Sequence, residues 1–338
     1  MKIIRPIVFI GIVTFNSERH VAKCLSMIRK QTYPNIQTIV LDNNSSDFSS
    51  RLIRKYIRKE KFIQSKVNIG YGMGHNAIIR ACHPRQKDYY MPLNPDVVLN
   101  PSYVSNLVTE LKNNNADWGI GKLYCMDSYH HSKKTIYSTG HALLSNGYAI
   151  NIGNGMLDDD KQFISKEVFG APGAAPLYTG KLIHSIAYKE GLFDKQMFMY
   201  YEDVDVDWRA RLNGFRCWYA STATGYHLGS TAQGRINTQA LANRYLSVIK
   251  NAHAYDLFVY NSIVIFCHCV FKLCTEPTEG IWLIQQLVKT NLYALKRRTS
   301  PKVPRSYMAG WFLLNKHQLT LQPKTILQRL MYYFNQQH

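Results

Sequence analysis

The chain is short of acidic residues. Its 338 residues include 22 Asp and Glu against 41 Lys and Arg, so the formal net charge is +19 at pH 7. A charge of this size indicates an anionic partner: nucleic acid, an anionic membrane surface or a phosphate-bearing substrate. The hydrophobic fraction of 46% is enough to build the core of one large domain or two.

Paired cysteines are also lacking. The seven cysteines are odd in number and form no Cys-x-x-Cys pair, which indicates reduced thiols in a protein of the cytosolic side. The cluster of Cys267, His268, Cys269 and Cys274 fits no common zinc spacing and lies in apolar surroundings, so we expect burial rather than metal binding. The first six residues are too few and too charged for a signal peptide.

No apolar run is long enough to span a membrane with ease. The longest C-terminal run without formal charge, residues 257–271, has 15 residues, whereas a spanning helix needs about 20. It also contains Asn261, Ser262 and His268. We therefore expect a buried or interfacial helix here.

The few acids are concentrated in one stretch, residues 199–215, where four carboxylates fall within six residues. If the stretch is helical, Asp203 and Asp207 share one face. One interpretation is a solvated helix start, where acids oppose the helix dipole. The other is that Asp203 is a general base, placed in surroundings that neighbouring apolar side chains keep dry.

The first 113 residues alternate between strand and helix patterns four times, which predicts a doubly wound α/β arrangement. The β-branched run 7–13 is typical of a strand buried on both faces. Polar residues follow the predicted strands at Asn16, at residues 42–46 and at residues 94–96. Open α/β sheets bind their ligands at the edge where the carboxyl ends of the strands lie.

Two glycine-rich segments predict close approach of the backbone to a ligand. Residues 68–76 follow a predicted strand and are expected to form a loop that opens a helix at residues 77–82, a context suited to phosphate binding. The segment 169–176 is small and turn-rich. Residues 158–160 are expected to be a solvated acidic loop, with a cation site as the less favoured alternative.

In this order the pieces resemble the inverting family 2 glycosyltransferases with the GT-A fold, in particular the bacterial rhamnosyltransferase type. The resemblance covers about residues 6–230 and rests on these motifs: Ile-Val-Thr-Phe-Asn16, Val-Leu-Asp42-Asn-Asn-Ser-Ser, Asn68-x-Gly70-x-Gly72-x-Gly74-x-Asn76, Leu-Asn94-Pro-Asp96-Val, Gly191-x-Phe-Asp194 and Tyr-Glu202-Asp203-Val-Asp-Val-Asp-Trp-Arg209. It implies an α/β fold with a mixed, mostly parallel Rossmann-like sheet and helices on both faces over residues 1–235. Residues 236–338 are then a helical, membrane-associating region.

The resemblance also implies roles for individual residues. Asp203 is the catalytic base, and Asp96 is a ligand of Mg²⁺ or Mn²⁺ on the diphosphate, with His227 as a further metal ligand. His227 alone, without the resemblance, is more often a packed histidine, and the resemblance makes the two interpretations about equally favoured. The implied contacts to nucleotide and sugar are Thr14, Asn16, Asp42, Asn68, Gly70, Gly74, Asn76, Asn94, Glu202 and Arg209. The chain departs from the family's Asp-x-Asp motif because Asn94 replaces the first acid.

The last 59 residues, from Gly280 onward, contain no Asp or Glu and nine Lys and Arg, interleaved with aromatic residues. This pattern is typical of helices that lie in an anionic membrane interface. A solvated basic tail is the alternative. We expect a peripheral protein on the cytoplasmic face of the bacterial inner membrane.

These observations predict a metal-dependent, inverting glycosyltransferase that acts on a lipid-linked or cell-surface glycan acceptor, with rhamnose from dTDP-rhamnose as the first candidate donor. A UDP-sugar such as galactofuranose or GlcNAc is one alternative. A non-catalytic, basic nucleic-acid- or membrane-binding protein is another. No helix-turn-helix, zinc-finger or RNA-binding signature is present, so we expect no nucleic-acid partner. The oligomeric state stays open.

Overall fold

The computed structural model describes residues 5–128, 134–158, 161–227 and 238–313. The chain forms two compact units. The N-terminal unit comprises residues 1–141 and 151–234, and the C-terminal unit comprises residues 142–150 and 235–338. The sequence indicated a boundary near residue 235 but gave no sign that residues 142–150 belong with the C-terminal unit.

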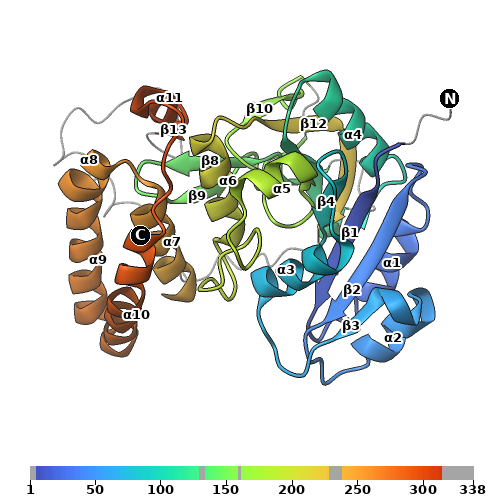
Figure 1. The fold of residues 1–338 in the computed structure, drawn as a ribbon, viewed down its shortest axis with the longest axis horizontal. Helices are drawn as coiled ribbons and strands as arrows, with labels where there is room; N and C mark the ends of the chain where they lie inside the picture. Colours follow the sequence, from blue (N-terminus) through green and yellow to red (C-terminus); the bar gives the residue numbers. More distant parts are fainter. Residues whose placement is uncertain (1–4, 129–133, 159–160, 228–237, 314–338) are drawn as a thin grey trace. The chain divides into compact units, whose positions relative to one another are not determined.

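A mixed, mostly parallel sheet forms the centre of the N-terminal unit (Figure 1). Its strand order is β10-β12-β6-β11-β4-β1-β2-β3, with β5 paired to β12 and β7 paired to β6. All seven residues of β1 are buried, as the β-branched run predicted. The strands are β1 (Val8–Thr14), β2 (Ile36–Asp42), β3 (Phe62–Gln64), β4 (Tyr89–Pro92), β5 (Val97–Leu99), β6 (Trp118–Cys125), β7 (Ile136–Ser138), β10 (Lys166–Val168), β11 (Leu177–Thr179) and β12 (Cys217–His227).

Helices cover the sheet of the N-terminal unit, and the predicted fold class is confirmed. Helix α3 packs on β1 and β2, and α4 packs on β6 and β12. The helices are α1 (Val21–Ile28), α2 (Ser49–Tyr56), α3 (Tyr71–Cys82), α4 (Tyr103–Asn113), α5 (Gly180–Ile186) and α6 (Glu202–Leu212), with short 3-10 turns η1 (Lys59–Lys61) and η2 (Met126–Ser128).

The expected glycine loop before residue 77 is wrong in one respect, because α3 already begins at Tyr71. Two of the glycines therefore lie inside the helix, where they allow close packing. A Cβ at Gly74 would lie 2.8 Å from the Val13 side chain, and one at Gly72 would lie 2.9 Å from that of Phe193. Packing against β1 outweighs the low helix propensity of glycine here.

Strand register brings the predicted site residues to one edge of the sheet. Thr14 and Asp42 are paired at the carboxyl ends of the parallel strands β1 and β2. Farther along the strand order, His227 at the end of β12 pairs with Val97 at the start of β5. The residue next to Val97 is Asp96, so the fold brings the two candidate metal ligands together.

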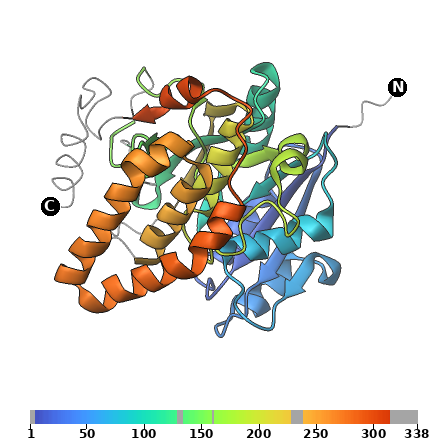
Figure 2. The same cartoon turned by 60° about the vertical axis from the view of Figure 1, so that its left-hand side comes forward.

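The C-terminal unit is helical, and Figure 2 shows α9 and α10 joined by a sharp turn. Helix α10 packs on both α7 and α9, around Leu241, Tyr245, Cys269 and Leu283. The elements are α7 (Thr238–Asn251), α8 (Ala254–Asp256), the π-helical η3 (Leu257–Asn261), α9 (Ser262–Thr275), α10 (Pro277–Lys296), α11 (Arg305–Ala309) and a small sheet of β13 (Phe312–Leu313), β8 (His141–Leu144) and β9 (Ala149–Asn151).

Residues 257–271, which we expected to be too short for a membrane span, are part of a longer helix. Elements α8, η3 and α9 run together as a 22-residue helix, Ala254–Thr275, which is long and apolar enough to cross a membrane by length and composition alone. A core helix of a soluble protein also meets this criterion. In the same segment, His268 is buried and bonded to the Tyr245 hydroxyl, and Cys269 lies in the core. The basic residues expected beyond residue 313 lie outside the described residues.

Candidate active site

The end of the site expected to hold the base and ribose centres on Asp42. Its carboxylate accepts hydrogen bonds from Thr14 Oγ1 at 3.1 Å, Ser45 Oγ at 2.5 Å and Gln64 Nε2 at 2.6 Å. Burial alone would raise the pKa of Asp42, but the hydrogen bonds from Ser45, Gln64 and Ser50 outweigh it and lower the pKa. Asp42 is fully buried, and its oxygens also accept from Ser45 N and Ser50 Oγ, so its carboxylate holds the loop after β2 in place at this end of the site.

Asn16 and Asn68 shape the loops beside Asp42. Asn16 adopts a left-handed backbone with φ of +49°, and its Oδ1 accepts the Ser46 N–H at 2.9 Å. Asn68 Oδ1 accepts the Gly70 N–H at 2.9 Å and the Asn43 side-chain amide at 2.7 Å. Asn43 is a buried residue whose role the sequence reasoning missed, although it lies in the predicted polar cluster.

The remaining residues of the glycine segment serve the architecture. Gly70 has φ of +81°, and a Cβ there would lie 2.3 Å from the Phe198 carbonyl oxygen. The Asn76 side chain donates to Phe193 O at 2.8 Å and accepts from Phe193 N at 3.0 Å. Both polar atoms of Asn76 are thus used by the protein, and Gly74 faces β1, so neither is placed to contact a nucleotide sugar.

The candidate metal ligands lie together as expected. His227 Nε2 is 3.3 Å from Asp96 Oδ1 and 3.4 Å from Asn94 Nδ2. Burial would raise the pKa of Asp96, but the hydrogen bond and charge of His227 lower it. The other ring nitrogen of His227 is buried and has no hydrogen-bond partner among the described residues.

This donor set fits a divalent cation. Carboxylate oxygen suits Mg²⁺ and Mn²⁺, and the neutral imidazole is a common metal ligand in proteins. Two neighbouring ligands of an octahedral ion, each bound at about 2.1 Å, lie about 3 Å apart, close to the Asp96–His227 separation. Among the described residues, no group of three or more His, Cys, Asp or Glu side chains is placed to hold a metal. Asp96 and His227 would therefore need oxygen ligands from the substrate or water.

The acid-rich stretch forms α6, but its acids are not a solvated helix start. The side chains of Asp205 and Asp207 are fully buried. Each is compensated within the protein, because Asp205 pairs with Arg209 at 2.9 Å and Asp207 accepts the Trp118 indole N–H at 2.9 Å. The left-handed backbone of Tyr200 and Tyr201 turns the chain sharply into the helix.

Asp203 is the partly exposed acid of this helix, with 17% of its side-chain surface accessible. Its Oδ2 accepts the Gly173 N–H at 2.7 Å. The Tyr71 hydroxyl donates to Gly173 O at 2.6 Å and so fixes the same loop from α3. The segment 169–176 thus approaches Asp203 through its backbone, and Tyr71 is a site residue that the sequence reasoning missed.

Glu202 differs from its neighbour. It is buried, and burial followed by the charge of Asp203 raises its pKa to about 8. Its Oε2 has no hydrogen-bond partner among the described residues. At pH 7 Glu202 is therefore mainly a neutral acid, which can donate a hydrogen bond but is a poor base.

Arg209 is held by the protein, not directed to a ligand. Its guanidinium pairs with Asp205 and donates to Ile186 O and Leu192 O, both at 2.6 Å. Asp158, expected in a solvated acidic loop, pairs with the buried Lys122 at 2.8 Å. The other two acids of that loop lie outside the described residues.

We expect Arg209→Met to lower the free energy of unfolding by about 3–5 kcal/mol, because it removes the cation from a buried ion pair. Urea denaturation of the variant measures this loss. Arg216→Met is the matched control, since Arg216 is 45% exposed in its pair with Glu167 and such pairs contribute at most about 1 kcal/mol. Equal losses in the two variants would contradict the structural role of Arg209.

Comparison with known proteins agrees with this arrangement. Residues 9–164 match the profile of "Glycosyl transferase family 2". An uncharacterized glycosyltransferase of Haemophilus influenzae is 30% identical over 119 residues, which are 34% of this chain and 36% of that protein. The match thus spans little more than a third of the length of that relative. Rhamnosyltransferase WbbL of Escherichia coli K12 is 24% identical over 263 residues, covering 70% of this chain and 96% of WbbL.

The fold also matches solved structures. The mannosyltransferase PcManGT of Pyrobaculum calidifontis, solved with GDP-mannose and Mn²⁺, superposes with a TM-score of 0.53. The identity is 12%, with 91% of this chain and 79% of that chain covered. These comparisons identify a glycosyltransferase: residues 9–164 match family 2, and the fold of the N-terminal unit is that of GT-A enzymes.

Proposed function

We propose that the protein is an inverting, metal-dependent glycosyltransferase that uses Asp203 as its base. The observation that carries this proposal is that Asp203 and Asp96 share two neighbouring tyrosines. The half-buried Tyr71 and Tyr137 each interact electrostatically with both carboxylates. These shared neighbours support a base and a candidate cation site near the edge of the sheet where α/β folds bind ligands.

The chain's own residues would divide the work of binding and catalysis. Thr14, Asn16, Asp42 and the Asn43–Asn68 pair form the nucleotide end. Asp96 and His227, with Asn94 beside them, would hold Mg²⁺ or Mn²⁺, which when bound neutralises the charge of the leaving diphosphate.

Asp203 accepts the proton of the acceptor hydroxyl as its oxygen attacks the anomeric carbon and the diphosphate departs. A positioned base supplies about 10²–10⁴-fold in rate. One displacement with one base inverts the anomeric configuration.

The match to WbbL over nearly the full length of that protein favours rhamnose as the transferred sugar. A UDP-sugar is the alternative donor, and a lipid-linked or other glycan is the proposed acceptor. We would test this by incubating the protein with radiolabelled dTDP-rhamnose, UDP-GlcNAc or UDP-galactofuranose, Mn²⁺ and bacterial membranes. Transfer of label from one donor to a lipid or polysaccharide fraction supports the proposal. No transfer from any donor, with metal-independent binding of nucleic acid, favours a non-catalytic binding protein.

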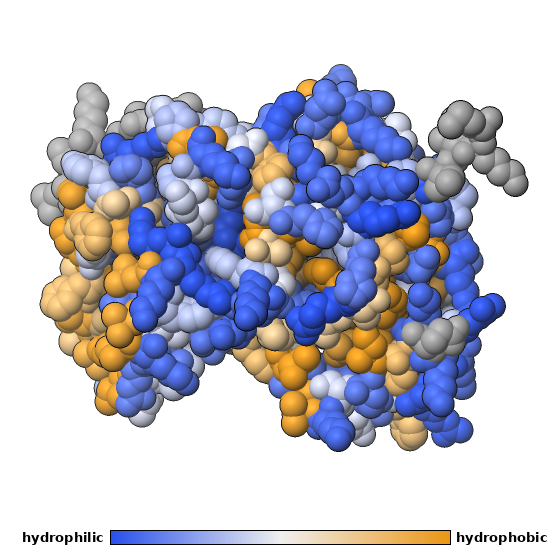
Figure 3. Space-filling model, in the orientation of Figure 1, coloured by the Kyte–Doolittle hydropathy of each residue, from blue (hydrophilic) through white to orange (hydrophobic). Residues whose placement is uncertain are grey.

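We also propose peripheral attachment to an anionic membrane through the C-terminal unit. The exposed residues of the 254–275 helix form an apolar stripe at helical spacing. Phe258 and Phe266 are each 68% exposed. Further exposed members of this stripe are Tyr255, Val259, Ile263 and Val270. Figure 3 shows hydrophobic surface at the left of the view, where Figure 1 places α9 and α10.

Charge indicates what covers this apolar stripe. The next helix, α10, carries exposed cations at Lys289 and Lys296 beside exposed Val288 and Leu292. Apolar residues with adjoining Lys favour the interface of an anionic bilayer. An exposed apolar patch of this kind also marks a binding surface on general grounds.

We expect the double variant Phe258→Glu/Phe266→Glu to bind anionic liposomes about 100-fold or more weakly, because each buried phenylalanine contributes about 1.5–3 kcal/mol. Flotation with vesicles containing phosphatidylglycerol measures the change. Phe48→Glu is the matched control, since Phe48 is 63% exposed but lies in the N-terminal unit. Unchanged flotation of the double variant would contradict attachment through this helix.

A further inference from the structure

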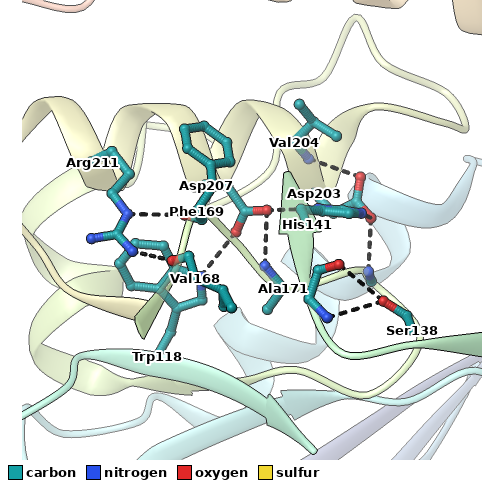
Figure 4. Close-up of polar contacts among 12 residues, drawn as sticks. Trp118, Ser138, His141, Val168, Phe169, Ala171, Asp203, Val204, Asp207 and Arg211 are labelled. Atoms are coloured by element: carbon teal, nitrogen blue, oxygen red, sulfur yellow. Dashed lines mark hydrogen bonds and ion pairs between the residues drawn. The ribbon is translucent and has the colours of Figure 1, made fainter. Parts of the chain in front are cut away.

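A buried histidine lies behind Asp203. His141 follows Gly140, whose φ of +132° is set in a turn where Ser138 Oγ bonds the Gly140 backbone. The His141 N–H donates to Gly170 O at 2.7 Å. These contacts direct the imidazole toward α6, where it lies between Asp207 and Asp203 (Figure 4).

Asp207 fixes the orientation of this imidazole. Its Oδ2 accepts His141 Nδ1 at 2.9 Å and the Ala171 N–H at 3.0 Å, while Oδ1 accepts the Trp118 indole. The carboxylate needs Gly170, because a Cβ there would lie 2.0 Å from Oδ2. With Nδ1 bonded to Asp207, His141 Nε2 faces Asp203 Oδ2 at 3.9 Å.

Electrostatics favour a charged imidazole in this position. Burial lowers the pKa of His141, but the hydrogen bond to Asp207 and the charge of Asp203 prevail and raise it. Burial raises the pKa of Asp207 to about 6 against the opposing effect of His141. Both carboxylates thus favour the protonated imidazole, whose Nε2–H points toward Asp203.

The other titratable groups around the two carboxylates do not cancel this charge. Burial raises the pKa values of the neighbouring groups and so favours their neutral forms near pH 7. These groups are Tyr71 on α3, Tyr137 on β7, Tyr178 on β11, Cys217 on β12 and Glu202 on α6. The cation Arg211 on α6 donates to Phe169 O and Val168 O.

We propose that His141, oriented by Asp207, is a positioning residue that presents its Nε2 to the Asp203 carboxylate and keeps this carboxylate directed at the acceptor hydroxyl. The proposal rests on the proposed function, in which Asp203 is the base. A nearby cation favours the charged form of a carboxyl. Removing the imidazole should therefore alter the pH dependence of the reaction.

A purely structural pair, which only holds His141 against α6, would show the same contacts. It would not affect the pH dependence of catalysis. The two roles are therefore separated by the pH profile of kcat/KM and not by the loss of activity at one pH.

The first test is His141→Gln, with His184→Gln as the matched control because His184 lies on α5 and bonds Pro84 O. We expect His141→Gln to reduce kcat at pH 7 about tenfold or more. Loss of a charge at this distance should move the acid limb of kcat/KM upward by about one to two pH units. Asp207→Asn should produce the same shift, and the double variant should add little, because the two residues act as a unit.

A second measurement does not depend on the folding of a His141 variant. Titration of the imidazole of His141 by ¹⁵N NMR in wild-type protein and in Asp203→Asn compares its pKa with and without the facing charge. The proposal predicts a lower pKa in Asp203→Asn. An unchanged pKa, or a wild-type acid limb in His141→Gln, overturns it.

The same variants separate this proposal from the proposed function. If Asp203→Asn retains wild-type turnover, the base assignment fails, and the role of His141 fails with it. If Asp203→Asn is inactive while His141→Gln keeps the wild-type pH profile, only the role of His141 fails.

Discussion

Replacing Asp203 by Asn should reduce kcat by about 10²–10⁴-fold and leave the affinity for the donor nucleotide unchanged. The amide cannot accept the proton of the acceptor hydroxyl, so the variant loses what a positioned base contributes. Donor binding does not need this base, because the nucleotide end is built around Asp42 and Asn68. Steady-state kinetics with the donor found in the transfer assay, and calorimetry with its nucleoside diphosphate, measure the two quantities.

Glu202→Gln is the matched comparison, since it changes the adjacent acid of the same helix. Glutamine resembles the neutral acid that the raised pKa of Glu202 predicts at pH 7. We expect a loss below about tenfold, well short of the effect of a lost base. A larger loss in Glu202→Gln than in Asp203→Asn would assign the base to Glu202.

The second large effect is expected at Asp96. Asp96→Ala should lower kcat/KM on the order of 10²–10³-fold, because a bound cation contributes several kcal/mol of charge stabilisation. The Mn²⁺ concentration needed for half-maximal activity should rise in parallel. His227→Ala should change the same two quantities in the same direction, since its Nε2 lies 3.3 Å from the Asp96 carboxylate.

Asp117→Asn is the control for Asp96. Asp117 lies at the start of β6, where its carboxylate accepts the Arg216 N–H and pairs with Lys181 at 3.3 Å. An asparagine there still accepts a hydrogen bond, so the Mn²⁺ dependence should be that of the wild type. Normal Mn²⁺ dependence in Asp96→Ala would show that this acid is not a metal ligand.

The sequence predicted the parts of the site that depend on local pattern. Strand ends are marked by a change from β-branched to polar residues, and parallel strands carry those ends to one edge. Thr14 and Asp42 therefore meet as expected. Asp96 and His227, 131 positions apart, were brought together by the family resemblance, and the pairing of β5 with β12 explains why.

The parts that failed depend on partners distant in the chain. The glycines at residues 72 and 74 signalled a loop, but Phe193 and Val13 require small residues inside a helix at those positions. The acids of α6 suggested a solvated face, yet Trp118 and His141 compensate Asp207 from elsewhere. The sequence did show that Asp203 and Asp207 share a helical face, and His141 faces both.

The calorimetric titration of nucleoside diphosphates tests the central claim most directly. Wild-type protein and Asp96→Ala would be titrated with dTDP, UDP, GDP and CDP, each with and without Mn²⁺. The account predicts that one nucleotide binds wild-type protein in a Mn²⁺-dependent manner and that this dependence is lost in Asp96→Ala. Binding of no nucleotide, or binding that is equal with and without Mn²⁺ in both proteins, would contradict a metal-dependent glycosyltransferase.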